Sequence, residues 1–191
     1  MTLALKEWHV VAEAISRGDQ VITVRKGGVR EKPFAVAGSS FWLYPNWEHQ
    51  EAAEVKRAWH GELARSNRER PTDGQIPIRC RCTVEAAWEL TDAEQLAGLD
   101  RWHLWTPVYA EARLEWRPTK PLTVLLLRAW ALIEPFPLDP DPAYGGCTSW
   151  IELQQEPPVS ALIPALTDEA FAIRAAAVGD VLGESAVEVG A

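Results

Sequence analysis

Residues 76–90 show the clearest alternation of apolar and polar side chains in the chain. Apolar residues occupy every second position: Ile78, Cys80, Cys82, Val84, Ala86 and Trp88. A period of two is typical of an antiparallel strand with one buried and one solvated face. The pattern therefore predicts a long strand that buries one set of side chains: Cys80, Cys82, Val84 and Trp88. It predicts that the opposite face exposes Arg79, Arg81 and Glu85.

Four other apolar segments predict strands. They cover residues 20–25, 41–44, 121–134 and 150–153. β-Branched and aromatic side chains dominate the first two segments, and Pro45 ends the second. The third segment is a long apolar run that begins with Pro121 and is followed by Pro135. We expect it to form a central strand of the sheet.

The first segment of the chain, residues 3–17, carries apolar side chains at helical spacing. One stripe contains Leu5, Trp8, Val11 and Ile15. This spacing predicts an amphipathic helix, and Gly18 suits the left-handed position that follows a helix end. On such a helix, Lys6 and Glu7 would lie on the solvated side.

Four further helices are predicted from apolar spacing or from capping residues. They cover residues 46–70, 91–98, 107–116 and 167–182. Thr91 and Glu94 form the pattern of a capping box, while Thr106 and Pro107 suit the N-cap and first helical position.

Together, these elements predict an α+β fold. We expect a mostly antiparallel sheet with helices packed on it from both termini, and closure of the sheet into a barrel is left open. A length of 191 residues suits one domain with a substantial core. We expect that domain to cover residues 1–183 and to be followed by a disordered tail at 184–191.

Composition narrows the class of protein. With 47% hydrophobic and 24% charged residues, the chain has the composition of a globular domain. The apolar runs are too short to span a bilayer and there is no signal-peptide pattern, so we expect a cytoplasmic protein without a membrane partner. Three cysteines, Cys80, Cys82 and Cys147, lack the spacing of a metal site. We expect them to be reduced, and we predict neither a metal nor a cofactor.

Charge and aromatic content bear on the ligand. A formal net charge of −8 argues against tight, non-specific binding of duplex nucleic acid. Ten tryptophans are more than a core of this size needs, and indoles supply stacking surfaces. The chain therefore favours a local aromatic pocket over an extended basic face.

The first candidate site follows the strand at residues 20–25. It contains Arg25, Lys26, Gly27 and Gly28. Two cations above a glycine pair could bind an anion or a nucleobase, although an ordinary strand ending in a solvated turn has the same pattern. His49, in the first turn of the predicted helix 46–70, is a further candidate, with a capping or surface role as the alternative.

The second candidate site precedes the predicted helix 107–116. It contains Arg101, Trp102, His103 and Trp105. These side chains could clamp a planar ligand, or they could be two core tryptophans beside a hydrogen-bonded histidine. Although the two candidate sites are far apart in the sequence, we expect them to line one cleft.

Several segments resemble a known family. LKEWHVVAEAI, VRKGGVRE, FWLYPNWEHQ and RWHLWTPVYAEARLEWRP are similar to the bacterial family named domain of unknown function 1802. The resemblance extends over nearly the whole chain. Its name implies no established activity.

A second, local resemblance concerns residues 18–25. Gly18, Thr23 and Arg25 keep the spacing of the G-x-K-x-x-[ET]-x-R motif of ASCH domains, and Gln20 stands at the lysine position. ASCH domains are PUA-like β-barrels associated with RNA and modified nucleosides. In ASCH-type amidohydrolases that lysine and the threonine are the implied catalytic pair, and a neutral amide cannot replace the lysine. The resemblance therefore implies a nucleotide pocket more than that hydrolysis.

The preferred function is binding of RNA or another nucleobase-containing ligand in an aromatic, locally basic pocket. Two alternatives remain: a nucleic-acid-processing enzyme, and a scaffold without a small ligand. The enzyme could be a metal-dependent nuclease of the PD-(D/E)XK type or an ASCH-like amidohydrolase with a substituted lysine. The nearest E-x-K sequence, at residues 54–56, falls on a predicted helix, which counts against the nuclease. The sequence leaves open whether the protein is an enzyme and its oligomeric state.

Overall fold

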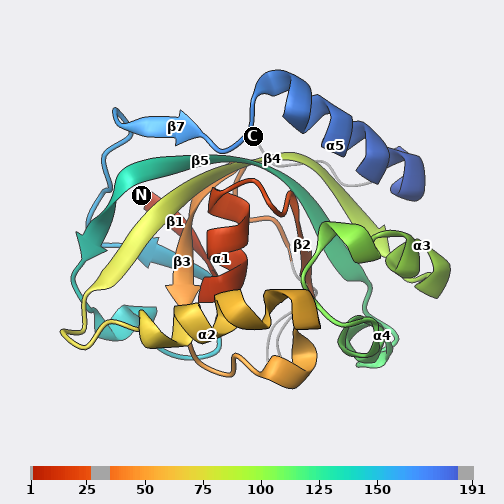
Figure 1. Ribbon diagram of the computed structural model, residues 1–191, viewed down its shortest axis with the longest axis horizontal. Helices are drawn as coiled ribbons and strands as arrows, with labels where there is room; N and C mark the ends of the chain where they lie inside the picture. Colours follow the sequence, from red (N-terminus) through yellow and green to blue (C-terminus); the bar gives the residue numbers. More distant parts are fainter. Residues whose placement is uncertain (1, 27–34, 185–191) are drawn as a thin grey trace.

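One seven-stranded sheet forms the centre of the molecule. The computed structural model describes residues 2–26 and 35–184 (Figure 1). Its strands are β1 (Thr2–Trp8), β2 (Ile22–Arg25), β3 (Ser40–Asn46), β4 (Ile76–Leu90), β5 (Leu122–Leu138), β6 (Trp150–Leu153) and β7 (Leu162–Pro164). They are ordered β2-β5-β4-β3-β1-β6, and β7 also pairs with β5. The predicted α+β class is confirmed, and β5 is an interior strand as expected.

The sheet is mostly antiparallel and open. β1 and β3 pair in parallel, while the other pairs among the described strands are antiparallel. No backbone pairing within the described residues joins the two ends of the sheet, β2 and β6. The sheet is therefore not the closed barrel that the ASCH resemblance implied.

Five helices and four short 3₁₀ turns accompany these strands in the described residues. The helices are α1 (His9–Ser16), α2 (His60–Arg68), α3 (Ala93–Gly98), α4 (Pro107–Glu115) and α5 (Asp168–Leu182). The 3₁₀ turns are η1 (Ala52–Glu54), η2 (Arg57–Trp59), η3 (Asp100–Trp102) and η4 (Pro142–Tyr144). In Figure 1, β4 and β5 arch over α1, with α2 below it and α5 beyond the arch. None of the described helices is long and apolar enough to cross a membrane.

The helix predicted at residues 3–17 is wrong in its first half. Residues 2–8 form β1, which lies between β3 and β6 and pairs with both. Two hydrogen-bonded neighbours satisfy the backbone of this segment as well as a helix would, so tertiary pairing outweighs the helical spacing. Only α1 remains helical, and Gly18 follows it with φ 74°, as predicted.

The helix predicted at residues 46–70 is also largely wrong, since α2 covers only its second half. His49 has a positive φ of 63°, a left-handed conformation that does not continue a helix. Val55 then forms an isolated antiparallel bridge with Trp105. This pairing brings the segment before α2 against the second candidate site.

The alternation along β4 is confirmed with one shift. Cys80, Cys82, Val84 and Trp88 are buried, and Glu85 is exposed, as predicted. Arg79 and Arg81 are half-buried rather than exposed. An irregularity in the pairing with β5 lies between Val84 and Ala86, so that Ala87 becomes fully buried although the pattern placed it on the solvated face.

The predicted helix starts after β4 are confirmed with one change of cap, since Asp92, and not the predicted Thr91, is the N-cap of α3. The Asp92 side chain accepts from the backbone N–H of Glu94 at the start of α3. Thr106 and Thr167 cap α4 and α5 in the same way. Capping is set by neighbouring residues, which is why the sequence alone predicted these boundaries.

Candidate ligand-binding cavity

A cavity of about 1100 Å³ opens beside the ends of three strands. β1 and β3 run in parallel, so Trp8 and Asn46 end at the same edge of the sheet, and both line the cavity. Arg25 at the end of β2 and Tyr109 in α4 contribute further walls. Pockets of about 300–1,000 Å³ hold drug-sized ligands, so this volume suffices for a nucleotide.

Three aromatic rings form one wall, and we call Trp8, Trp105 and Tyr109 the aromatic trio. The centroids of Trp8 and Trp105 lie 4.8 Å apart with an interplanar angle of 73°. Tyr109 lies 5.1 Å from Trp105 and 6.4 Å from Trp8, tilted by only 28° against the latter. These are the edge-to-face and offset arrangements that aromatic rings prefer. The trio is therefore a packed wall whose geometry is fixed before a ligand arrives.

Glu7 is a buried carboxylate at the base of this wall. Its side chain is only 5% exposed. Oε2 accepts hydrogen bonds from Thr23 Oγ1 at 2.7 Å and from Arg25 Nη1 at 3.1 Å, while Oε1 accepts from the Trp8 N–H at 2.9 Å. β2 and β1 are separated by three strands in the sheet. The hydrogen bonds from Thr23 and Arg25 to Glu7 nevertheless join them, so the sheet must curve strongly. Arg25 therefore neutralises an internal charge, which competes with binding of an external anion.

Lys26 fixes a helix to the cavity. Its side chain is 4% exposed, and its Nζ donates to the carbonyl of Leu114 in the last turn of α4. A cation at this position complements the helix dipole. Burial lowers the pKa of Lys26, and the nearby Arg113 guanidinium acts in the same direction. The primary role of Lys26 is thus to anchor α4.

The other cations of the cavity also have partners within the protein. Lys6 donates to the carbonyls of Gly145 and Gly146 at 3.1 and 3.0 Å, and burial lowers its pKa. Arg70 pairs with Glu48. Arg113 lies over the ring of Trp116. Among the described lining residues there are five cations, Lys6, Arg25, Lys26, Arg70 and Arg113, against four carboxylates, Glu7, Glu48, Glu51 and Glu54. The cavity is therefore close to electrically balanced.

His103 differs from these side chains in the hydrogen bonding of its ring. It is 5% exposed and lines the cavity, and within the described residues neither ring nitrogen has a partner in hydrogen-bonding geometry. Burial lowers the pKa of His103 to about 4, and Lys56 contributes in the same direction, while Asp100 and the Trp105 backbone oppose the shift. The imidazole is therefore neutral near pH 7.

The structure brings together only part of the predicted sites. Arg25, Lys26, His49, His103 and Trp105 line the same cavity. His49 is an exposed turn residue and not part of a helix. Gly27 and Gly28 lie outside the described residues.

Two predicted residues lie elsewhere. Arg101 is exposed and covers the ring of Trp102 at 4.8 Å, and Trp102 packs against the apolar cluster around Leu96 and Phe171. Neither residue lines the cavity. Trp102 therefore follows the core alternative, because it packs against that apolar cluster and not in the cavity.

Sequence reasoning missed Glu7, Trp8 and Tyr109. The helix predicted at residues 3–17 put Glu7 on a solvated side, and Trp8 in the core. Read as a strand, the same segment would have placed a carboxylate and an indole at a strand end, where sites commonly form. Tyr109 lies one turn into α4, directly above the predicted cap Thr106, and had no signal of its own.

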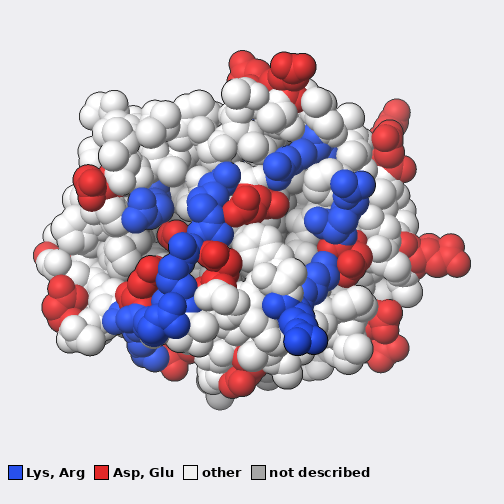
Figure 2. Space-filling view, in the orientation of Figure 1, with Lys and Arg blue, Asp and Glu red and all other residues white. Residues whose placement is uncertain are grey.

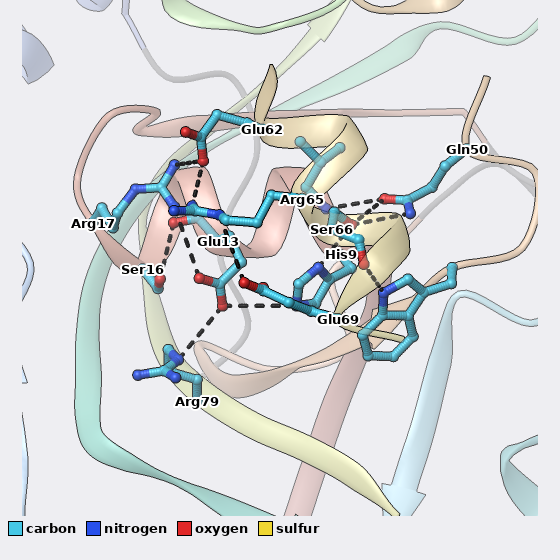
Figure 3. A network of polar contacts seen from close by, with 12 residues as sticks. His9, Glu13, Ser16, Arg17, Gln50, Glu62, Arg65, Ser66, Glu69 and Arg79 are labelled. Atoms are coloured by element: carbon cyan, nitrogen blue, oxygen red, sulfur yellow. Dashed lines mark hydrogen bonds and ion pairs between the residues drawn. The ribbon is translucent and has the colours of Figure 1, made fainter. Parts of the chain in front are cut away.

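A second polar network lies around α1 (Figure 3), and Trp47, which stacks on His9 at 4.4 Å, separates it from the cavity that it also lines. His9 Nδ1 lies 2.8 Å from Ser66 Oγ, and His9 Nε2 lies 3.9 Å from Glu13 Oε1. Serine, histidine and carboxylate in this order have the composition of a hydrolase triad. However, Ser66 is 2% and His9 6% exposed, and neither residue is among those that line the cavity.

This network instead joins α1 to α2. Gln50 accepts from the backbone N–H of Val10 at 3.0 Å, and its amide donates to Ser66 Oγ at 3.2 Å. Figure 3 shows Arg17, Arg65 and Arg79 gathered around Glu13. Burial lowers the pKa of His9 to about 4, with smaller contributions from these three guanidinium groups.

The residues of the ASCH-like motif do not form a catalytic pair in the cavity. Gln20 is buried, its Nε2 donates to the carbonyl of Ile22 at 2.7 Å, and its Oε1 accepts from the N–H of Leu104 at 3.2 Å. Thr23 is buried against Glu7. Neither Gln20 nor Thr23 lines the cavity. Both side chains therefore hold β2 in place.

The lysine of the E-x-K sequence likewise has partners within the protein. Lys56 donates to the carbonyls of Asp100 and His103 and forms an ion pair with the Asp100 carboxylate at 3.0 Å. Glu54 lies in η1 and not in the helix that was predicted there. Within residues 2–26 and 35–184, no group of three or more His, Cys, Asp or Glu side chains could hold a metal ion.

Comparison with solved structures finds ASCH proteins of Zymomonas mobilis. The crystal structure of ASCH from this organism aligns with a TM-score of 0.47 and 17% sequence identity, over 81% of this chain and 88% of that chain. A mutant form aligns with a TM-score of 0.46 and 16% identity, over 81% and 91%. Another aligns with a TM-score of 0.44 and 16% identity, over 92% and 94%.

A search of curated proteins gave no match. A family model, in contrast, matches residues 4–177. Because this match spans most of the chain, the protein belongs to the family described as Domain of unknown function (DUF1802).

Proposed function

We propose that the cavity binds a nucleobase-containing ligand, with the base against the aromatic trio. The observation that carries this proposal is the trio itself, three rings packed at fixed angles on the wall of a large cavity. Stacking of a base on an aromatic side chain contributes about 1–3 kcal/mol. A preformed wall increases the affinity further, because no side chains need to be ordered when the ligand binds.

The electrostatics support recognition of the base more than of the phosphates. Most cations of the cavity already hold a carboxylate or a backbone carbonyl. On the face drawn in Figure 2, basic and acidic side chains interleave and do not form a patch of one sign. Binding would therefore depend on stacking and hydrogen bonds in the cavity. This arrangement fits either a free nucleotide or one nucleotide of a single-stranded RNA.

Replacement of Trp8 tests the proposal, with Trp102 as a matched control. Both indoles are half-buried, but only Trp8 lines the cavity. We expect Trp8→Leu to weaken binding of a ribonucleoside monophosphate or a short single-stranded RNA by about 5- to 150-fold, the loss of one stacking contact. Trp102→Leu should leave the affinity unchanged.

Isothermal titration calorimetry would measure these affinities. The probes are the four ribonucleoside 5′-monophosphates and a single-stranded RNA of five nucleotides, which separate a free nucleotide from an RNA end. The proposal fails if the wild-type protein binds none of these probes. It also fails if the two leucine variants lose affinity equally.

A further inference from the structure

A buried imidazole without hydrogen-bond partners needs an explanation. About nine in ten buried polar groups in proteins have a partner, and leaving one unpaired destabilises the fold. Among the described residues, neither ring nitrogen of His103 has a partner in full hydrogen-bonding geometry, although the ring lines the cavity and the Trp105 backbone lies close enough to act on its pKa. A group of this kind inside a cavity is typical of a site whose partner arrives with the ligand.

Hydrogen bonds to the backbone of His103 and of the next residue fix the position of His103. Its carbonyl accepts from Lys56 Nζ at 2.8 Å, and the next N–H, that of Leu104, donates to buried Gln20. The backbone of His103 is extended, with φ −138° and ψ 159°. His103 and Trp105 both line the cavity, while Leu104 between them is buried in the core. The imidazole is therefore held beside the aromatic trio.

The chemistry of the ring defines what it can bind. A neutral imidazole carries one N–H donor and one bare nitrogen acceptor. A phosphate that is fully ionised offers only acceptors and leaves the bare nitrogen unpaired. The edge of a nucleobase offers both a donor and an acceptor, and its π-face can lie on the adjacent indoles.

We infer that His103 is a specificity-determining residue, which hydrogen-bonds the polar edge of a base stacked on the aromatic trio. This inference rests on the proposed function, because it assigns the part of the ligand that lies deepest in the same cavity. It also assigns different roles to the two residue types: the trio provides affinity for any base, and His103 distinguishes between bases by their edges.

Base analogues that lack edge groups test the role of His103. The probes are the best-bound ribonucleoside 5′-monophosphate and its matched analogue, purine riboside 5′-monophosphate for a purine or 2-pyrimidinone riboside 5′-monophosphate for a pyrimidine. We expect the wild-type protein to prefer the natural nucleotide by at least tenfold. His103→Phe should reduce this preference to less than threefold while it still binds the analogue. His103→Gln, which restores a donor and an acceptor, should recover part of the preference.

Thermal unfolding without ligand provides an independent readout. Because the ring nitrogens make no hydrogen bond in good geometry to the described part of the chain, His103→Phe should leave Tm unchanged or raise it. A clear fall in Tm in both His103 variants would mean that the ring serves the fold, and would overturn the inference. An unchanged preference in His103→Phe would also overturn it, even if Trp8→Leu confirms binding at the trio. No nucleotide binding by the wild type would overturn the proposed function and the inference together.

Discussion

At the scale of single residues, the molecule holds two histidines in their neutral form by burial. The pKa of His9 and that of His103 are each lowered to about 4 from an ordinary value of 6.5. The charged groups that act on His9 are Glu13, Arg17, Arg65 and Arg79, and Glu69 acts on Glu13. Those that face His103 are Lys56 and Asp100.

This burial predicts that the protein loses stability as the pH falls from about 6.5 to about 4. In that range the unfolded chain binds protons at both histidines and the folded state does not, so the unfolding free energy decreases as the pH is lowered. Each of the two histidines contributes up to about 3 kcal/mol over the full window. Above pH 6.5 their contribution is fully present. Glu13 opposes the trend, because burial raises its pKa and the folded state then binds the extra proton.

Urea unfolding at pH 7.0, 5.5 and 4.5 would measure this decrease. His103→Phe should make the dependence on pH shallower, because one of the two groups is removed. His49→Asn changes an exposed histidine in a left-handed turn, where asparagine is well tolerated, and should not alter the dependence. Equal stability of the wild type at all three values would contradict the prediction.

At the scale of elements, the sequence predicted those features that neighbouring residues determine. The caps at Thr106 and Thr167 and the alternation of β4 belong to this class. The cap of α3 is Asp92, one residue after the predicted Thr91. The segments that it mispredicted depend on distant partners. β1 is a strand because β3 and β6 pair with it, and the irregularity before Ala86 follows from the register of β5.

Trp88 at the end of β4 provides a prediction about one element. Its side chain is buried in the cluster shared with α3 and α5, and its Nε1 donates to the carbonyl of Gly183 at 3.1 Å. We expect Trp88→Ala to lower the unfolding free energy by about 3–5 kcal/mol, through lost transfer energy and a residual cavity. Glu85→Ala, on the exposed face of the same strand, should change it by less than about 0.5 kcal/mol.

Denaturant unfolding monitored by circular dichroism would compare the two variants. A loss below about 1 kcal/mol for Trp88→Ala would show that the cluster between the sheet and the C-terminal helix contributes little to stability. Similar losses in both variants would mean that burial does not distinguish the two faces of β4.

At the scale of the whole molecule, the candidate site was only partly predictable. His103 and Trp105 line the same cavity as Arg25, and the pairing of Val55 with Trp105 joins their loop to the segment before α2. The aromatic and charged composition of each segment indicated a site. The place of Glu7, Trp8 and Tyr109 in the cavity depends on how the sheet curves, which the sequence does not show. Trp102 lies in a segment of the same aromatic and charged composition, but its side chain packs against the core.

The distribution of charge over the whole molecule predicts a weak dependence of RNA binding on salt. The formal net charge is −8, and most cavity cations are paired internally, so a bound strand would have only one or two phosphates neutralised. For single strands, the slope of log K against log salt is about −0.7 per neutralised phosphate. Affinity should therefore fall by only about three- to sevenfold between 50 and 200 mM salt.

Titrations of labelled single-stranded RNAs of three and ten nucleotides, at several salt concentrations, would test this expectation. If one nucleotide occupies the cavity and the rest of the strand stays in solvent, the two lengths should bind with similar affinity and similar salt slopes. A duplex of the same sequence should bind much more weakly, because its bases are stacked on one another and cannot reach the aromatic trio. A slope steeper than about −3, or an affinity that rises strongly with length, would instead indicate an extended basic surface and would contradict binding in the cavity.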